Sequence, residues 1–470
     1  MLRALQRHFI WIGIGCYMLS LLAVSVCFHD YRLHTEWLAW GIGTVLFFFL
    51  MSYGFTQRWA RDDSRKFLQK AFWTALALRA VYVVAMLYYY YYRTYISFEF
   101  GAADSIGYHL TASHMADLAR QGQLGTIFQQ LNDSTMGFSD QGYVLYLTTL
   151  YTLFGKNVLG PRLLKAILSA SLCIAVYRIT RRNMGEKTAR LATVMTVFLP
   201  QFIHYTGTYL KETELIGLLV WAMERVDYLI HSKKITFWNV FIPFLLTALT
   251  FGLRTIVGMI LIGSYAVAII MADTRLMAKK AKYYSLGALL LVILAFLITP
   301  IGKEMLFTFK LNFKESGFLT WKYQQLGMKY AEYAHFKYMA PGAFALPLTN
   351  LVEVANENQK LMNGTYFVKN YLAFFAMWCL VVVFREKKWR SASLVGSFTL
   401  VYVLVIAFSF AANSERYHLP ALPGIVIMAA YAMTHFRRKD FGWYYAYCAL
   451  LVVAIVGWNY LKLSARGLIP

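Results

Sequence analysis

Apolar runs of roughly 17–22 residues recur along the chain between short polar segments, and these lengths suit membrane-spanning helices. A helix satisfies its own backbone hydrogen bonds in lipid, whereas barrel strands are shorter and alternate apolar with polar residues. The pattern therefore predicts an all-α polytopic membrane protein with about thirteen spans. They are expected near residues 9–28, 37–55, 71–92, 162–180, 190–207, 213–231, 236–252, 255–272, 284–300, 370–385, 392–411, 420–436 and 442–460.

Arginine and lysine residues are concentrated in alternate connecting segments. Just over half of the 46 basic residues fall near the N-terminus and in segments 58–70, 178–190, 233–234, 275–282, 385–390 and 437–439. Short loops rich in these residues stay on the cytoplasmic side of a membrane. The pattern predicts a cytoplasmic N-terminus and, with an odd number of spans, an extracytoplasmic C-terminus.

Two long segments, 93–161 and 301–369, are predicted on the extracytoplasmic side. Within the first, the tyrosine-rich run 142–154 is short for a span and is expected to lie along the membrane surface. The second is basic and aromatic, and predicts one or two amphipathic helices on the headgroups. The expected division is an N-terminal hairpin with a basic loop (1–70), a catalytic transmembrane core (71–300) containing the first long loop (93–161), the second loop (301–369) and the C-terminal helices (370–470).

Composition supports a membrane protein, since 59% of residues are hydrophobic and only 15% are charged. A net charge of +23 would suggest a nucleic-acid partner in a soluble protein. No basic non-membrane domain exists to bind one, so we expect no nucleic acid and assign the charge to loops facing anionic lipids. The five cysteines lie in or beside apolar runs without a CxxC pair, which favours neither zinc nor a disulfide framework.

The segment FEFGAADSIGYHLTASHMADLARQG, residues 98–122, sets Asp104 at the start of a predicted amphipathic helix. Tyr108 and His109 follow one turn later, and Glu99 precedes it, so all are candidates for one pocket. Asp104 would lie at the outer membrane surface, where it meets both lipid headgroups and water-borne substrates and is suited to act as a general base. The alternatives are an ordinary helix N-cap for Asp104 and a surface position for His109.

Lys211 and Glu212 are predicted at the outer end of the hairpin between two spans, in HYTGTYLKETELIGLL. Acidic residues number only 23 in 470, so a second carboxylate at the level of Asp104 is a candidate catalytic group. The alternative is a pair of charges that reach the headgroups from a helix end.

Arg254 and Arg416 are predicted beside spans on the same outer side. A buried arginine is costly in hydrocarbon, and its forked donors suit a lipid phosphate. The alternatives are a purely positional charge for Arg254 and a local pair with Glu415 for Arg416.

Four segments together resemble the GT-C superfamily of integral-membrane glycosyltransferases, and in particular the bacterial group related to protein O-mannosyltransferases and the lipid A aminoarabinose transferase. They are AADSIGYHLTASHMADL, GYVLYLTTLYTLFGKNVLGPRLLKAILSASLCIAVYRITRRNMGEKTARLAT, FLPQFIHYTGTYLKETELIGLL and SERYHLPALPGIVIMAA. The third is similar to the family's proline-containing span and acidic loop, and the fourth to its late Arg–Tyr–x–x–Pro segment.

The resemblance implies transfer of a sugar from a polyprenyl phosphate, with inversion, on the extracytoplasmic face. The acceptor would be a hydroxyl of a glycan, lipid or protein. It makes Asp104 the general base and Glu212 the second-loop acid. The predicted substrate-binding residues are Glu99, Tyr108, His109, Lys211, Arg254, Arg416 and Tyr417.

Two departures from the family pattern concern the acidic residues. Two further spans precede the first acidic loop, and Asp104 has no adjacent carboxylate, so use of a divalent cation stays open.

Two other functions fit a polytopic chain. An O-antigen or capsule polymerase or ligase would use a pyrophosphate-linked donor and tolerate loss of Asp104. A lipid-glycan transporter or flippase would carry ionisable residues at mid-membrane and broken helices in paired halves. In each case we expect a multi-pass protein surrounded by membrane lipids, of the bacterial inner membrane, with its site facing the periplasm or exterior.

Overall fold

A computed structural model describes most of the chain as helices. No strand occurs in the described part, although Arg32 and Val352 form an isolated β-bridge. The described residues are 2–133, 138–232, 234–272, 279–299, 302–303, 306, 342–353, 357–408, 414–464 and 466–469. The amphipathic helices predicted for the second long loop fall largely on residues outside this set.

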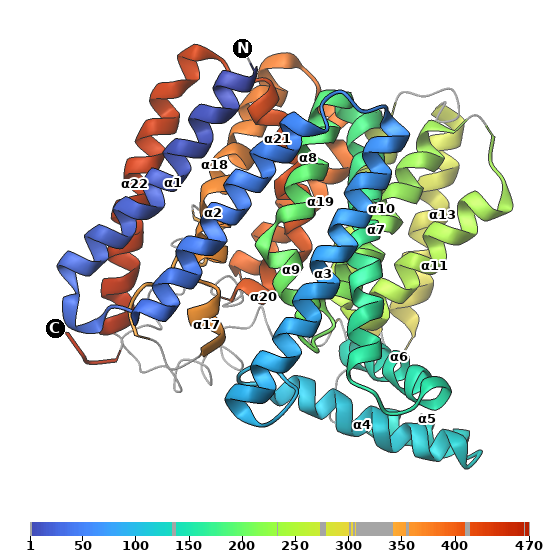
Figure 1. Ribbon diagram of the computed structural model, residues 1–470. Helices are drawn as coiled ribbons and strands as arrows, with labels where there is room; N and C mark the ends of the chain where they lie inside the picture. Colours follow the sequence, from blue (N-terminus) through green and yellow to red (C-terminus); the bar gives the residue numbers. More distant parts are fainter. Residues whose placement is uncertain are drawn as a thin grey trace.

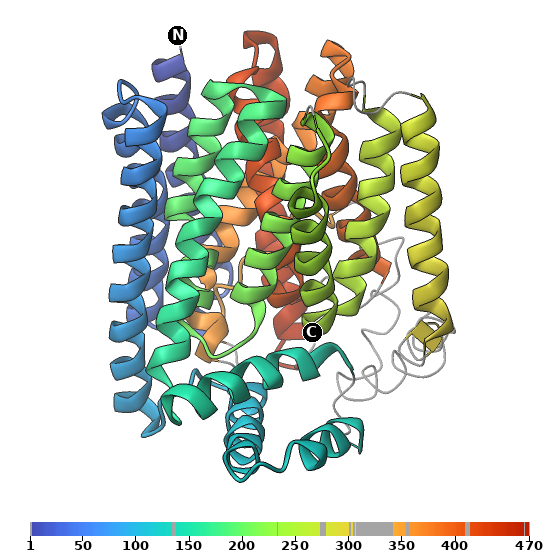
Figure 2. The ribbon, with the colours of Figure 1, turned by 90° about the vertical axis from the view of Figure 1, so that its right-hand side faces the viewer.

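Most helices run side by side in one bundle, and the short helices α9 and α20 continue or connect them (Figures 1 and 2). They are α1 (Leu2–Cys27), α2 (Thr35–Arg58), α3 (Ser64–Thr94), α7 (Leu159–Met184), α8 (Glu186–Phe198) continued by α9 (Pro200–Gly207), α10 (Glu212–His231), α11 (Phe237–Leu253), α12 (Thr255–Met271), α13 (Lys279–Ile298), α18 (Asn363–Glu386), α19 (Trp389–Phe408), α20 (Glu415–His418), α21 (Leu422–Thr434) and α22 (Phe441–Ser464).

Among the described residues, eight helical segments are long and apolar enough to cross a membrane. Three shorter apolar helices, Phe237–Leu253, Thr255–Met271 and Lys282–Ala295, accompany them. The chain is therefore an all-α, multi-pass integral membrane protein, as predicted. The number of thirteen spans stays a prediction.

The two ends of the bundle differ. The N-terminus lies at one end and the C-terminus at the other, where α3 passes into α4 (Ala103–Arg120) (Figure 1). We call the latter the α4 end. There α4, α5 (Leu124–Asp133) and α6 (Phe138–Phe154) lie across the bundle rather than along it (Figures 1 and 2). The short helix α17 (Glu357–Leu361) also lies near this end.

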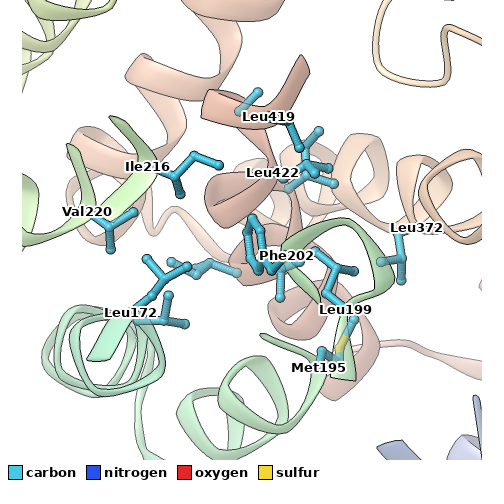
Figure 3. Close-up of a cluster of buried hydrophobic side chains, with 14 of the residues drawn as sticks. Leu172, Met195, Leu199, Phe202, Ile216, Val220, Leu372, Leu419 and Leu422 are labelled. Carbon is cyan, nitrogen blue, oxygen red and sulfur yellow. The ribbon is translucent and has the colours of Figure 1, made fainter. Parts of the chain in front are cut away.

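Buried apolar side chains from the central helices meet in one cluster (Figure 3). In lipid, helices associate through close packing rather than through burial from water, so such interlocking decides their positions. The cluster brings side chains of α9 and α10 together with the start of α21. The labelled members are Leu172, Met195, Leu199, Phe202, Ile216, Val220, Leu372, Leu419 and Leu422.

A close approach of two glycines docks α6 on α11. A Cβ atom added at Gly142 would collide with the carbonyl oxygen of Gly252. Only glycine permits this contact between backbones. It fixes the end of α11 immediately before Arg254.

Candidate functional site

The guanidinium of Arg416 binds both carboxylates that the sequence singled out. Its Nη1 donates to Oδ2 of Asp104, and its Nε donates to Oε1 of Glu212. The Nη2 of Arg254 lies 3.0 Å from the same Glu212 oxygen. Segments far apart in the sequence thus bring two arginines and two carboxylates together at the α4 end. We call these four residues the arginine–carboxylate cluster.

The cluster runs from a buried end to an open one. The side chain of Glu212, the first residue of α10, is 0% exposed, and that of Arg254 is 10% exposed. Arg416 is 21% and Asp104 is 54% exposed. Since Glu212 is fully enclosed, it acts on its surroundings through the arginines that hold it. Asp104 is the member that solvent reaches most easily.

The helix N-cap proposed as an alternative role for Asp104 is wrong. The N-cap of α4 is Ala102, and Asp104 is the second residue of the helix. Its carboxylate accepts a hydrogen bond from Arg416. The carboxylate therefore points out of the helix toward the cluster.

The local pair between Glu415 and Arg416 is also wrong. Glu415 is buried, and its Oε2 accepts from Nζ of Lys369 at 2.8 Å. Its Oε1 accepts from Nε2 of Gln201 at 3.2 Å. Because Lys369 and Gln201 hold Glu415, the adjacent arginine is left to bridge Asp104 and Glu212.

Arg254 occupies the sharp reversal between α11 and α12. Its backbone is extended, with φ −160° and ψ 102°, and the guanidinium lies 5.1 Å from the ring centroid of Tyr417. Such a cation–π contact helps to fix the orientation of the Arg254 guanidinium. Within the described residues, Nη1 of Arg254 and Oε2 of Glu212 are buried without a hydrogen-bond partner.

Lys211 hydrogen-bonds the backbone at the turn between α11 and α12 that carries Arg254. It is the N-cap residue of α10, and its Nζ donates to the carbonyl oxygen of Leu253 at 2.6 Å. This bond ties the start of α10 to the end of α11, one residue before Arg254.

Glu99 is buried beside the cluster and links the two turns that carry Asp104 and Glu212. Its Oε1 accepts from the hydroxyl of Ser105, and its Oε2 accepts from the backbone N–H of Tyr209 at 3.0 Å. Ser105 follows Asp104 directly, and Tyr209 precedes Glu212 by three residues. Glu99 therefore fixes the geometry of the cluster from outside it.

Tyr108 and His109 hold α4 against α6. The buried ring of Tyr108 meets that of Tyr143 edge-on, with centroids 5.1 Å apart. Nδ1 of His109 lies 2.7 Å from the hydroxyl of Tyr151. Burial, assisted by Lys156, lowers the pKa of His109 below its ordinary value. These contacts place both side chains in the α4–α6 interface.

Sequence reasoning missed two fully buried cations on α7. Arg162 lies 3.8 Å from Oε2 of Glu99, over the ring of Tyr209 at 5.3 Å. Lys165 donates to the carbonyls of Thr208, at 3.2 Å, and Leu210. The sequence does contain a sign of these buried charges, because two cations one turn apart beside an apolar span are unusual in a membrane helix. Together they stabilise the backbone that leads to Glu212.

A metal ion has no evident place between the two carboxylates. Both bind Arg416, and no group of three His, Cys, Asp or Glu side chains suited to a metal occurs in the described ranges. The arrangement fits a guanidinium at this position. The use of a divalent cation, which the sequence leaves open, is not tested by this geometry.

A separate apolar cavity of about 50 Å³ lies among α1, α2, α8, α18 and α21. Phe9, Phe48, Phe49 and Tyr371 are among its lining residues. None of the cluster residues lines it.

No protein-family model matches the chain, and no curated protein matches it. A solved structure that does match is the crystal structure of ArnT from Cupriavidus metallidurans bound to undecaprenyl phosphate. It is 13% identical, the match covers 86% of this chain and 73% of that chain, and the TM-score is 0.48. At this level of similarity the chemistry has to be argued from the side chains of this chain.

Proposed function

We propose that this protein is a membrane glycosyltransferase that moves a sugar from a polyprenyl-phosphate donor to an acceptor hydroxyl. The observation that supports this most is the arginine–carboxylate cluster, in which Arg416 joins the exposed Asp104 to the buried Glu212 and its second arginine, Arg254. It combines the cations that a phosphate needs with a carboxylate that can accept a proton.

Arg254 and Arg416 are proposed to bind the donor phosphate. Arg416 on α20 and Arg254 between α11 and α12 meet at the start of α10 beside α4. We propose that this position is at the depth of the lipid headgroups. An isoprenoid chain would then lie along the helices with its phosphate at the rim. Glu212 holds one edge of each guanidinium, so the phosphate meets arginines that are already oriented. This preorganisation lowers the cost of binding and of charge development on the leaving group.

Asp104 is proposed as the general base. The acceptor oxygen attacks the anomeric carbon of the sugar, and its proton passes to the Asp104 carboxylate. The bond between that carbon and the phosphate oxygen breaks, and its electron pair leaves with the polyprenyl phosphate. A single displacement of this kind inverts the anomeric centre. Positioning and proton removal together provide the acceleration.

The proposed side of the membrane follows from the basic turns. Those between α2 and α3, between α7 and α8, and between α18 and α19 lie at the end of the bundle opposite α4. By the positive-inside rule that end faces the cytoplasm, so the cluster faces the periplasm or exterior. We infer a role in building a cell-envelope glycan in the bacterial inner membrane.

The donor class can be tested by thermal stability of the purified protein. Undecaprenyl phosphate should raise the melting temperature of the wild type more than undecaprenyl pyrophosphate does, and Arg254→Met should remove the effect. Arg93→Met is the matched control, because Arg93 lies in the last turn of α3, at the same end of the bundle, and pairs with Glu36 at 3.5 Å. A larger shift with the pyrophosphate would favour the polymerase or ligase, and an unchanged shift in Arg254→Met would contradict the phosphate site.

A further inference from the structure

We propose that the lipid phosphate and the Asp104 carboxylate compete for the same edge of Arg416, so that donor binding releases the base the reaction needs. This inference rests on the proposed function and deepens it. It answers a difficulty in the structure, because the Asp104 oxygen that faces the cluster is already occupied by a hydrogen bond from Arg416 and does not face an acceptor hydroxyl.

The two carboxylates on Arg416 differ in how firmly they are held. Glu212 is fully buried and is also bound by Arg254, so separating it from Arg416 would leave a buried charge uncompensated. Asp104 is 54% exposed, and an exposed ion pair contributes little stability. An incoming anion therefore displaces Asp104 and leaves Glu212 in place.

The helix that carries Asp104 is anchored independently of this ion pair. The next residue, Ser105, donates to buried Glu99, and Tyr108 packs on Tyr143 one turn later. Asp104 can then leave Arg416 by rotation of its own side chain, without movement of α4. The released carboxylate stays beside the phosphate, where the acceptor hydroxyl arrives.

Charge favours displacement of Asp104 when the donor binds and its return to Arg416 after transfer. Arginine binds phosphate through two parallel N–H bonds, and the lipid tail concentrates the phosphate at the rim. After transfer, Asp104 holds the proton and is neutral, while the product phosphate gains negative charge. When Asp104 loses that proton to water, it competes again for Arg416 and promotes release of the product lipid.

The test is the affinity for undecaprenyl phosphate, measured without any sugar in nanodiscs of fixed lipid composition. Asp104→Asn removes the competing charge and should bind the lipid about two- to fivefold more tightly than the wild type. Asp104→Ala provides a second variant without the carboxylate and should behave alike. The matched control is Asp117→Asn, which removes an exposed carboxylate from the same helix, paired there with Lys156 at 2.6 Å. It should leave the affinity unchanged.

The possible results distinguish failure of the proposed exchange on Arg416 from failure of the proposed function. Equal or weaker lipid binding by both Asp104 variants would overturn the exchange and leave the donor class intact. A wild type that does not bind undecaprenyl phosphate would overturn the donor class as well. Inorganic phosphate, measured in parallel, should bind far more weakly, and equal affinity would show that the site takes free phosphate rather than a lipid.

Discussion

Arg416 and Asp104 lie 312 positions apart in the sequence, and their side chains form an ion pair at the α4 end of the bundle. The contact joins a four-residue helix near the end of the chain to the first helix that lies across the bundle. Because the other edge of Arg416 binds Glu212, this single side chain connects the exposed and the buried parts of the site. The proposed chemistry follows from that connection.

Replacement of Asp104 by asparagine should reduce sugar transfer by a factor of about 10²–10⁴, the usual contribution of a general base. The protein should still fold and insert, since the Asp104 side chain is largely exposed. Turnover with a polyprenyl-phosphate sugar, together with the melting temperature, measures both effects. Near-normal turnover would remove Asp104 from the mechanism, and Asp117→Asn on the same helix provides the control.

Replacement of Arg254 by alanine should weaken binding of the donor about ten- to a hundredfold, because a charge-assisted hydrogen bond to phosphate is lost. The effect should appear mainly in KM for the lipid donor, with KM for the acceptor little changed. Steady-state kinetics with each substrate varied in turn checks this. If only the acceptor KM rises, the phosphate does not contact Arg254.

The buried pair of Glu99 and Arg162 should matter for stability. Arg162→Met leaves Glu99 without its arginine and should lower the free energy of unfolding by about 3–5 kcal/mol. Adding Glu99→Gln to that variant should recover part of the loss, since the uncompensated charge is then absent. A double-mutant cycle measured by thermal unfolding tests the coupling, and strictly additive losses would contradict it.

Acidification should destabilise the α4–α6 contact through His109. Its pKa is lowered by burial and by Lys156, so the unfolded chain binds the proton more readily than the folded one. Stability is therefore highest above the ordinary pKa of 6.5 and falls as the pH drops through it. Unfolding followed between pH 8 and pH 5 should show this fall, and His109→Gln should flatten it. An identical pH profile in the variant would show that other groups are responsible.

The sequence predicted the helical class, because hydrophobic run length determines which segments span a membrane. It also placed four charged residues that meet in the structure, Asp104, Glu212, Arg254 and Arg416, on one side of the membrane, because basic loops determine the topology. It did not predict which charges meet. Glu415 and Arg416 are neighbours in the chain, yet Lys369 takes the carboxylate and Arg416 turns to Asp104 and Glu212. Such partners depend on how helices rotate about their axes, which local patterns do not contain.

The sequence also did not predict the positions of the buried charged residues. Glu99 was expected to face substrate, whereas Ser105 and Tyr209 enclose it, and Arg162 was not singled out. Tyr108 and His109 follow Asp104 by one turn, as expected, but they contact α6. Helical spacing predicts which residues share a face, and the tertiary packing then decides what that face meets.

A structure of the protein bound to undecaprenyl phosphate in a lipid nanodisc tests the central claim most directly. We predict the phosphate within hydrogen-bond distance, about 3 Å, of both Arg254 and Arg416, with Asp104 detached from Arg416 and close to the anion. A phosphate bound elsewhere, with the Asp104–Arg416 pair intact, would contradict the account.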